Sequence, residues 1–281
     1  MDPGDRLTHL IDAAFAQQEN EDGKRTHLGA SVVGRKCLRE VWLSWRWAGA
    51  EGTKDDGRML RLFDRGDKEE ERFAGYLRSV GATVWTHDAN GKQFRISAYG
   101  GHLGGSLDGV ATNIPGFPHG PAETPVVTEF KTHNDKSFKE LLKKGVQASK
   151  PQHYNQAQLY MWGYGISWCL YMGVNKNDDS LYLRYFPYDA QIAHYLLARA
   201  KTVIFGAGAP PRITSDPTWF ECRFCDFRRV CWKEKPLDQN CRTCRFAAPL
   251  EDGTWACAKG EPAITLHPKQ GCDKYEPIPD I

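Results

Sequence analysis

The hydrophobic and polar positions of the chain predict an alternation of helices and strands. Between Arg58 and Val80, apolar residues recur in steps of three and four, which indicates a helix, and Gly81 is suited to end it. Two runs of alternating apolar and polar residues follow at 82–88 and 92–99, separated by an Asn-Gly turn signal. A helix followed by short strands is typical of a mixed α/β domain.

The run from Val126 to Lys131 predicts a strand because β-branched residues open it. Side chains alternate across a strand, so Glu129 and Lys131 project from the same face. Asp108, in the sequence GGSLDGV, is separated from Glu129 by 20 residues. Two carboxylates can hold a divalent cation through oxygen ligands, which leaves the lysine to steady a nucleophilic water or a developing negative charge. The alternative is a surface strand with alternating charges.

One face of the predicted helix at 58–80 is apolar except for a single acid. The face consists of Met59, Phe63, Gly66, Glu70, Phe73, Leu77 and Val80. A carboxylate in apolar surroundings is costly unless a cation pairs with it, so Glu70 is a candidate metal-site residue, whereas we expect Glu69 and Glu71 to reach solvent. The alternative places Glu70 at the edge of the stripe with its carboxylate in water.

Lysines cluster directly after the predicted strand. They are Lys136, Lys139, Lys143, Lys144 and Lys150. We interpret this cluster as a set of phosphate contacts, with a merely solvated helix as the alternative.

Pro151 is suited to the first position of a further helix. Gln152, Gln156 and Tyr160 recur every four residues and therefore share one face of that helix. A neutral amide there can bind phosphate or the attacking water without competing for the metal; an ordinary amphipathic helix is the alternative. Beyond it, 167–174 and 180–186 predict a hairpin, and 189–205 predicts a helix.

The spacing of the nine cysteines favours metal ligation over disulfides. Two groups can be separated, namely Cys37 with Cys222, Cys225 and Cys231, and then Cys241, Cys244, Cys257 and Cys272. Cys37 lies near the start of a predicted, locally basic helix at 31–47, and Cys169 lies in an apolar run as a small buried residue. The second group has zinc ribbon-like spacing, because paired and later thiolates can supply a closed tetrahedral Zn²⁺ site.

Length and composition narrow these interpretations. A chain of 281 residues with 41% hydrophobic and 26% charged residues can form one globular domain with an appendage, or two small domains. No run reaches membrane-spanning length and no secretory leader precedes the first helix, so we expect a cytoplasmic protein with no membrane partner. The net charge of +2 is too small to indicate nucleic-acid binding, which must come from local clusters.

The order of the motifs resembles the PD-(D/E)XK nuclease superfamily, and within it the RecB-like and phage-type exonucleases. The resemblance covers about residues 30–235 and is carried by Gly66, Glu70, Asp108, Glu129, Lys131, Gln156 and Tyr160. It implies a restriction-endonuclease-like fold, with a mixed central sheet flanked by helices. It also implies that Asp108 and Glu129, joined by Glu70, hold Mg²⁺ or Mn²⁺. The family often has a histidine where this chain has Asp67, so the role of that histidine is not carried over.

Cys37 followed far downstream by Cys222-x2-Cys225-x5-Cys231 resembles the iron–sulfur staple of AddB-type nucleases. The resemblance implies a [4Fe–4S] cluster held by these four thiolates. Such a cluster would close a loop of 185 positions (222 minus 37) and would stabilise the fold by roughly 5 kcal/mol through denatured-state entropy. Zinc in the same four cysteines is the alternative.

We therefore expect a nuclease core at 1–210, an iron–sulfur segment at 211–236 and a zinc module at 237–281. The expected function is metal-dependent exonucleolytic hydrolysis of linear DNA, single- or double-stranded, in end processing for recombination or repair, with a recombinase or single-strand annealing protein as candidate partner. The alternatives are a structure-specific endonuclease and a non-catalytic zinc or iron–sulfur DNA-binding protein.

Overall fold

The computed structural model describes residues 2–22, 25–49, 57–259 and 272–279. The chain folds into two compact units. Unit 1 consists of Met1–Arg25, Thr53–Ile96 and Ser106–Ala190, and unit 2 consists of Thr26–Gly52, Ser97–Gly105 and Gln191–Ile281. Neither unit is continuous in sequence, so each one brings together segments that lie far apart in the chain.

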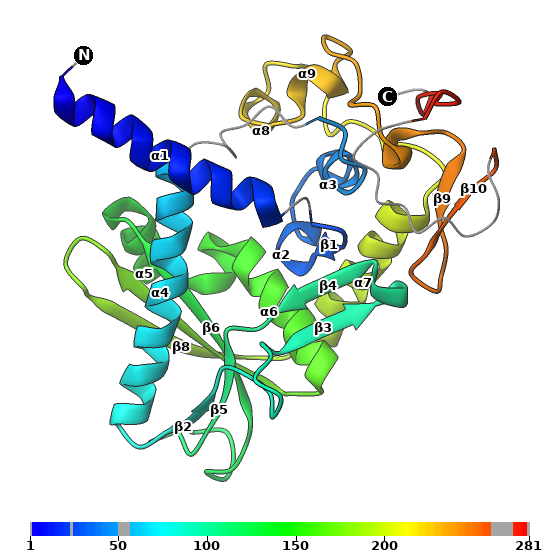
Figure 1. Ribbon diagram of the computed structural model, residues 1–281. Coiled ribbons are helices and arrows are strands. Elements are labelled where there is room, and N and C mark those ends of the chain that lie inside the picture. Colours follow the sequence, from blue (N-terminus) through cyan, green and yellow to red (C-terminus); the bar gives the residue numbers. More distant parts are fainter. Residues whose placement is uncertain (1, 23–24, 50–56, 260–271, 280–281) are drawn as a thin grey trace. The chain divides into compact units, whose positions relative to one another are not determined.

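A five-stranded mixed sheet forms the centre of unit 1, with the strand order β2-β5-β6-β7-β8 (Figure 1). The strands are β2 (Thr83–Trp85), β5 (Gly109–Thr112), β6 (Val126–His133), β7 (Trp168–Asn175) and β8 (Leu181–Pro187). β6 and β7 run parallel, and the other neighbouring pairs are antiparallel. β6 is therefore an internal strand with a hydrogen-bonded neighbour on each side, which fixes the direction of its side chains.

Helices cover both faces of this sheet, which confirms the predicted arrangement. On one face, α4 (Gly57–Ser79) packs Phe73 against Phe130 of β6 with ring centroids 5.1 Å apart. On the other face lie α5 (Asp135–Ser149) and α6 (Pro151–Tyr164), which pack against β6 and β7. α1 (Pro3–Asp22) packs on α4, where Asp12 forms an ion pair with Arg61.

Two details of unit 1 differ from the expectations. The turn at Asp88 is present, since its N–H donates to Lys92 O over 2.7 Å, but β2 pairs with β5 while β3 (Arg95–Ala98) joins a different sheet. The predicted apolar stripe of α4 is only partly buried, because the core meets this helix around Phe73 and leaves Phe63 56% exposed.

Unit 2 combines one long helix with short elements. The long helix is α7 (Ala190–Phe205), and a three-stranded sheet has the order β1-β4-β3, in which β1 is Leu28–Gly29 and β4 is Leu103–Ser106. The helix predicted at 31–47 is instead two helices, α2 (Ala30–Val33) and α3 (Leu38–Trp45), with Cys37 as the N-cap of α3. The break begins at Gly34, and glycine disfavours the interior of a helix.

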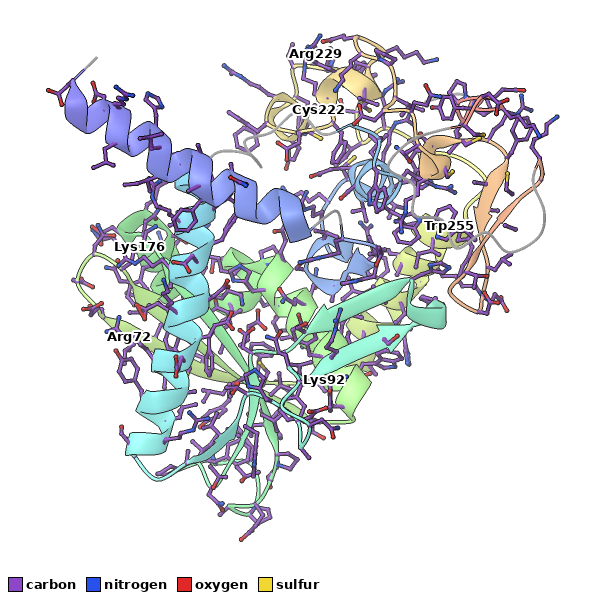
Figure 2. The ribbon with its side chains drawn as sticks, in the orientation of Figure 1. Arg72, Lys92, Lys176, Cys222, Arg229 and Trp255 are labelled. Carbon is purple, nitrogen blue, oxygen red and sulfur yellow. The ribbon has the colours of Figure 1, made fainter. Side chains whose placement is uncertain are left out.

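After α7 the elements shorten to three or four residues. They are α8 (Phe220–Arg223), α9 (Arg228–Cys231), η3 (Cys241–Thr243), β9 (Ala247–Pro249) and β10 (Trp255–Cys257), and a further 3₁₀ turn, η2, spans Tyr99–Gly101. Long-range side-chain contacts hold them together. The buried Arg242 guanidinium lies 4.3 Å from the ring centroid of Trp45 and 5.1 Å from that of Trp255, labelled on β10 in Figure 2.

The three-part division expected from the sequence stays a prediction. The compact units divide the chain differently, since 26–52 and 97–105 belong with the cysteine-rich C-terminal part. Residues 260–271 and 280–281 of the expected zinc module lie outside the described residues. Over the parts of the chain that the structure describes, no helix has the length and apolar character needed to cross a membrane.

Candidate active site

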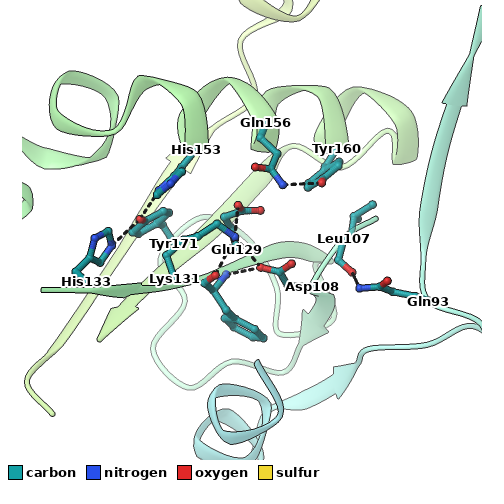
Figure 3. Close-up of polar contacts among 11 residues, drawn as sticks. Gln93, Leu107, Asp108, Glu129, Lys131, His133, His153, Gln156, Tyr160 and Tyr171 are labelled. Atoms are coloured by element: carbon teal, nitrogen blue, oxygen red, sulfur yellow. Dashed lines mark hydrogen bonds and ion pairs between the residues drawn. The ribbon is translucent and has the colours of Figure 1, made fainter. Parts of the chain in front are cut away.

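The β6 strand brings three predicted site residues together in unit 1 (Figure 3). Asp108 lies in the bend between β4 and β5, where its Oδ2 accepts a hydrogen bond from Phe130 N at 2.7 Å. Lys131 Nζ lies 3.3 Å from the same Oδ2 and 2.7 Å from Glu129 Oε1. The ammonium group thus bridges two carboxylates that are separated by 20 residues in the sequence.

Glu129 is the most deeply buried acid of this group, with no exposed surface. Lys131 is its ion-pair partner, yet neither carboxylate oxygen accepts a hydrogen bond of good geometry in the described structure. A buried carboxylate normally accepts several hydrogen bonds. Glu129 therefore has oxygen lone pairs available for a further cationic partner.

Burial and mutual repulsion perturb the protonation of the site. Burial, opposed by Lys131 and reinforced by Asp108, raises the pKa of Glu129 to about 8. The pKa of Lys131 lies well above its ordinary value because Asp108 and Glu129 outweigh the effect of burial. One ammonium group cannot neutralise all the carboxylates nearby, so the site retains a proton near neutral pH unless another cation enters.

Glu70 reaches the same group of charges from α4. Burial and the proximity of Asp108 raise the pKa of Glu70 to about 7. Burial raises the pKa of Asp67, one turn earlier on α4, and the charges of Asp64 and Asp108 raise it further. The expectation that Glu69 reaches solvent is wrong, because its side chain is buried against the helix and pairs with Arg72 at 2.5 Å.

The glutamine and tyrosine of α6 form a direct contact. Gln156 Nε2 donates to Tyr160 Oη at 2.7 Å, which confirms that they share a helical face (Figure 3). Tyr160 is buried, and burial together with the nearby Glu129 raises the pKa of its phenol. Gln152, the third residue of the predicted face, is exposed. The pair Gln156 and Tyr160 therefore lines the side of the site opposite β6.

A hydrogen-bonded chain beside the site was not predicted. Tyr171 Oη on β7 lies 3.0 Å from His133 Nε2 and 2.9 Å from His153 Nδ1 (Figure 3). Burial and the positive charges of Lys150 and Lys131 lower the pKa of His133 to about 4, and burial with the same lysines lowers that of His153 to about 3. Both imidazoles are therefore neutral at physiological pH. The period-two face that carries Glu129 and Lys131 continues to His133, so strand alternation in the sequence could have placed His133 on the same face.

One of the clustered lysines, Lys150, acts on the histidines beside this site. It lies at the junction of α5 and α6 and acts electrostatically on His133 and His153. Lys144 instead pairs with Glu140 at 2.8 Å on the helix surface. Lys150 Nζ also lies 3.8 Å from Glu140 Oε2. The solvated-helix interpretation therefore fits Lys144, and a phosphate contact by Lys150 stays a prediction.

The first cysteine group gathers in unit 2. Cys37, Cys222, Cys225 and Cys231 line one small cavity together with apolar Leu43, Ile213 and Trp232, and Cys222 is labelled on α8 in Figure 2. Burial, with Glu40, Cys37 and Cys231 nearby, raises the pKa of Cys225 to about 12. Thiols that are costly to ionise in a protein cavity become thiolates when a metal binds them.

The second cysteine group is built on a tight turn. Cys244 N donates to Cys241 O at 3.2 Å, and Asn240 caps this turn by accepting from Arg242 N at 2.9 Å. Burial raises the pKa of Cys241, and the nearby Cys272, Cys244 and Cys257, the other three members of the group, raise it further. The eight cysteines thus separate in space into the two predicted groups. Cys169 is buried in β7, as expected.

The protein's described residues include no group of three or more His, Cys, Asp or Glu side chains arranged to hold a metal ion as they stand. At the β6 site the chemistry of the donors nevertheless fits a hard divalent cation. Apart from its ion pair with Lys131, Glu129 accepts no hydrogen bond of good geometry from the described residues, and Asp108 and Glu70 lie close enough to act on it electrostatically. The ammonium of Lys131 now supplies the positive charge that these carboxylates require.

No family model matches the chain, and no curated protein matches it in sequence. Among solved structures, the chain is similar to SSO0001, with 16% identity over 80% of this chain and 96% of that one and a TM-score of 0.44. It is also similar to an alkaline exonuclease (LHK-Exo) from Laribacter hongkongensis, with 18% identity over 66% of this chain and 90% of that one and a TM-score of 0.44. The same exonuclease in complex with dAMP gives 17% identity, coverages of 69% and 90%, and a TM-score of 0.42. At such identities and TM-scores, no residue role passes from these proteins to this chain.

Proposed function

We propose that this chain is a divalent-metal-dependent deoxyribonuclease that hydrolyses phosphodiester bonds at the ends of linear DNA. The observation that carries the proposal is the fully buried Glu129, which lies beside Asp108 with Lys131 Nζ 2.7 Å from its Oε1, and which accepts no hydrogen bond of good geometry from the described residues. A structural ion pair would leave fewer unpaired oxygens, because burying a carboxylate without partners is costly. A site for a cation and an anionic substrate accounts for this cost.

Asp108, Glu129 and Glu70 are the residues that would hold Mg²⁺ or Mn²⁺. When bound, the cation would lower the pKa of a water molecule and offset negative charge on the phosphate. The raised pKa values of Glu129 and Glu70 mean that binding displaces protons. Affinity for the cation should therefore rise with pH up to about 8, where both acids lose their protons unaided.

Lys131 is the residue that would act on the reacting groups directly. Its ammonium keeps its charge over the working pH range because two carboxylates raise its pKa. With those carboxylates engaged by a cation, Lys131 would orient the attacking water and stabilise charge that develops on the phosphate oxygens. Its place on a buried internal strand holds it there without rearrangement.

Gln156 and Tyr160 would position the substrate from α6. The amide of Gln156 donates one hydrogen to Tyr160, and its carbonyl oxygen remains able to accept from the attacking water. Lys150 would contact a neighbouring phosphate of the strand.

The cysteines would serve the fold of unit 2. We assign a [4Fe–4S] cluster to Cys37, Cys222, Cys225 and Cys231, and Zn²⁺ to Cys241, Cys244, Cys257 and Cys272. Their grouping around one cavity and one turn supports four-thiolate ligation at each place. Neither metal would take part in hydrolysis.

The test is an assay of the purified protein on end-labelled linear DNA and on covalently closed circles, with and without Mn²⁺. We expect Mn²⁺-dependent loss of linear DNA, with circles spared. Glu129→Gln and Lys131→Ala should each lower the rate by about 10²–10³-fold, because each removes a preorganised charge. Glu71→Gln, an exposed acid next to Glu70 on α4, is the matched control and should cleave like the parent.

The outcomes separate the alternatives. Rapid nicking of circles would identify an endonuclease, and DNA binding by the parent without any cleavage would identify a non-catalytic binding protein. Near-normal cleavage by Glu129→Gln, with circular dichroism matching the parent, would contradict the assigned site. End processing for recombination or repair predicts a recombinase or single-strand annealing partner, which co-purification can test.

A further inference from the structure

Unit 2 contains a wide hollow that is lined by positive charge. Its volume is about 550 Å³, and its lining consists of Arg39, Pro211, Arg212, Thr214, Ser215, Trp232 and Lys233. Three of these residues are cations and two carry hydroxyl groups, whereas no carboxylate belongs to this described lining. A hollow of this size and composition is suited to an anionic ligand larger than a single ion.

The cations of the hollow differ from those around it. Arg212 donates to a neutral acceptor, Cys231 O, at 2.5 Å, and Arg39 donates to Pro210 O at 2.7 Å. Among the described residues, no acid pairs with Arg39, Arg212 or Lys233. Three nearby cations outside the hollow do pair with acids, in the ion pairs Arg228–Glu234, Lys235–Asp238 and Lys36–Glu221. Arg39, Arg212 and Lys233 thus face no carboxylate among the described residues, although Arg212 also lies 4.6 Å from the ring centroid of Trp232 and borders the cavity of the first cysteine group.

Arg39 is buried, unlike an arginine on a solvated surface. Its side chain is only 5% exposed, and its buried Nε has no hydrogen-bond partner in the described structure. Arg46 is buried to the same degree and also has an unpartnered Nε, but its guanidinium lies over the rings of Trp42 and Trp255, whereas Arg39 lines the hollow. An anion in the hollow would supply the missing charge.

Exposed aromatic side chains occur in the same segment as the hollow. Trp219, Phe220 and Phe224 are 52%, 70% and 69% exposed, and the rings of Phe220 and Phe224 lie 5.3 Å apart. The guanidinium of Arg223 lies 5.7 Å from the ring of Phe224. Exposed aromatic rings beside cations are the combination on which unpaired bases stack while their phosphates are neutralised.

We propose that this hollow is a phosphate-binding site for single-stranded nucleic acid, with Arg39, Arg212 and Lys233 neutralising the phosphate and Thr214 and Ser215 donating hydrogen bonds to it. The site lies within unit 2 and shares no residue with the carboxylate site of unit 1. It goes beyond the proposed hydrolysis and does not depend on it. A strand bound there would be held without being cleaved.

The test measures fluorescence anisotropy of a labelled oligothymidylate with the full chain in EDTA, so that cleavage does not interfere. Lys233→Gln should weaken binding several-fold and reduce the slope of log affinity against log salt by about 0.7, the value for one phosphate contact on a single strand. Ser215→Glu, which adds a negative charge at an exposed position, should weaken binding further. Lys235→Gln is the matched control, because Lys235 lies outside the hollow and already pairs with Asp238.

Each outcome decides the proposal. Parent-like affinity and salt slope in both Lys233→Gln and Ser215→Glu would overturn it, as would equal weakening by Lys235→Gln. Competition by inorganic phosphate or dAMP as effective as that by the oligonucleotide would show a small-anion site and contradict strand binding, and so would tighter binding of a blunt duplex. If the chain binds DNA in a Lys233-dependent way but cleaves none, the proposed hydrolysis is contradicted and the phosphate-binding site is supported. If the chain cleaves DNA but binding does not depend on Lys233, the proposed hydrolysis is supported and the phosphate-binding site is contradicted.

Discussion

The two units hold their charged groups and candidate metal ligands in place in opposite ways. In unit 1, the candidate catalytic side chains project from β6, an internal strand whose neighbours and apolar core hold it in place. In the cysteine-rich end of unit 2, the helices and strands span only three or four residues and cannot bury a core of their own. Contacts around Arg242 stabilise this region, and in our proposal metals bound by the two cysteine groups supply the rest. Metal should therefore matter for chemistry in unit 1 and for folding in unit 2.

The largest expected effect is the loss of a cysteine-bound metal. Cys231→Ser should abolish the brown colour and the iron of anaerobically purified protein and make unit 2 susceptible to proteolysis, because the metal supplies folding free energy there. Elemental analysis with limited proteolysis measures both changes. Cys272→Ser should release zinc and leave the colour unchanged, and Cys169→Ala, in the core of unit 1, should change neither metal. Zinc in both groups without iron would refute the iron–sulfur assignment.

Arg242 allows unit 2 to be weakened without touching a cysteine. Its guanidinium donates to Trp45 O at 2.9 Å and lies 4.2 Å from the ring centroid of Trp47. Arg242→Met should lower the free energy of unfolding by about 2–4 kcal/mol, because buried carbonyls lose their donor and the rings lose a cation. Urea unfolding measures the change, with Arg245→Met, an exposed neighbour, as control. An unchanged urea midpoint would contradict a supporting role for Arg242.

The stability of unit 1 should depend on pH, because one ammonium group does not neutralise its buried carboxylates. Unfolded glutamate ionises near 4.5, whereas the folded chain retains protons at Glu70 to about 7 and at Glu129 to about 8. The folded state then binds more protons than the unfolded state in this range, so stability falls as pH rises from 6.5 to 8, by up to about 1.4 kcal/mol per pH unit for each proton. Thermal unfolding in EDTA measures this slope. Glu129→Gln should flatten it and Mn²⁺ should oppose it; a slope unaffected by either would contradict the assignment.

The neutral histidines should also make stability depend on pH, but more weakly, and with stability rising instead of falling as the pH rises. The pKa of His133 falls from 6.5 to about 4 on folding, so the unfolded chain binds protons first as the pH is lowered. This contribution to stability is complete above pH 6.5 and is lost as the pH falls through 4. His133→Gln should flatten the stability profile between these limits, measured by urea unfolding. His9→Gln, exposed on α1, is the control; a matching change there would indicate a general charge effect.

Local periodicity in the sequence is enough to predict the parts of the site that lie within one element. Period-two alternation placed Glu129 and Lys131 on one face of a strand, and a step of four placed Gln156 and Tyr160 on one face of a helix; both relations hold in the structure. Proline at 151 correctly marked the beginning of α6. These predictions succeed because the geometry of one strand or one helix fixes which of its own side chains lie together.

Contacts between different elements could not be predicted in this way, because they depend on how the whole chain packs. β2 pairs with β5, although the sequence favours a hairpin with the next strand, because the turn at Asp88 does not determine which sheet each strand joins. Glu69 is buried against an expectation of solvent, and His153 and Tyr171 join His133 from separate elements. Unit 2 likewise assembles from 26–52, 97–105 and the C-terminal part. Periodicity describes one element at a time, whereas burial and pairing depend on which distant element covers each face.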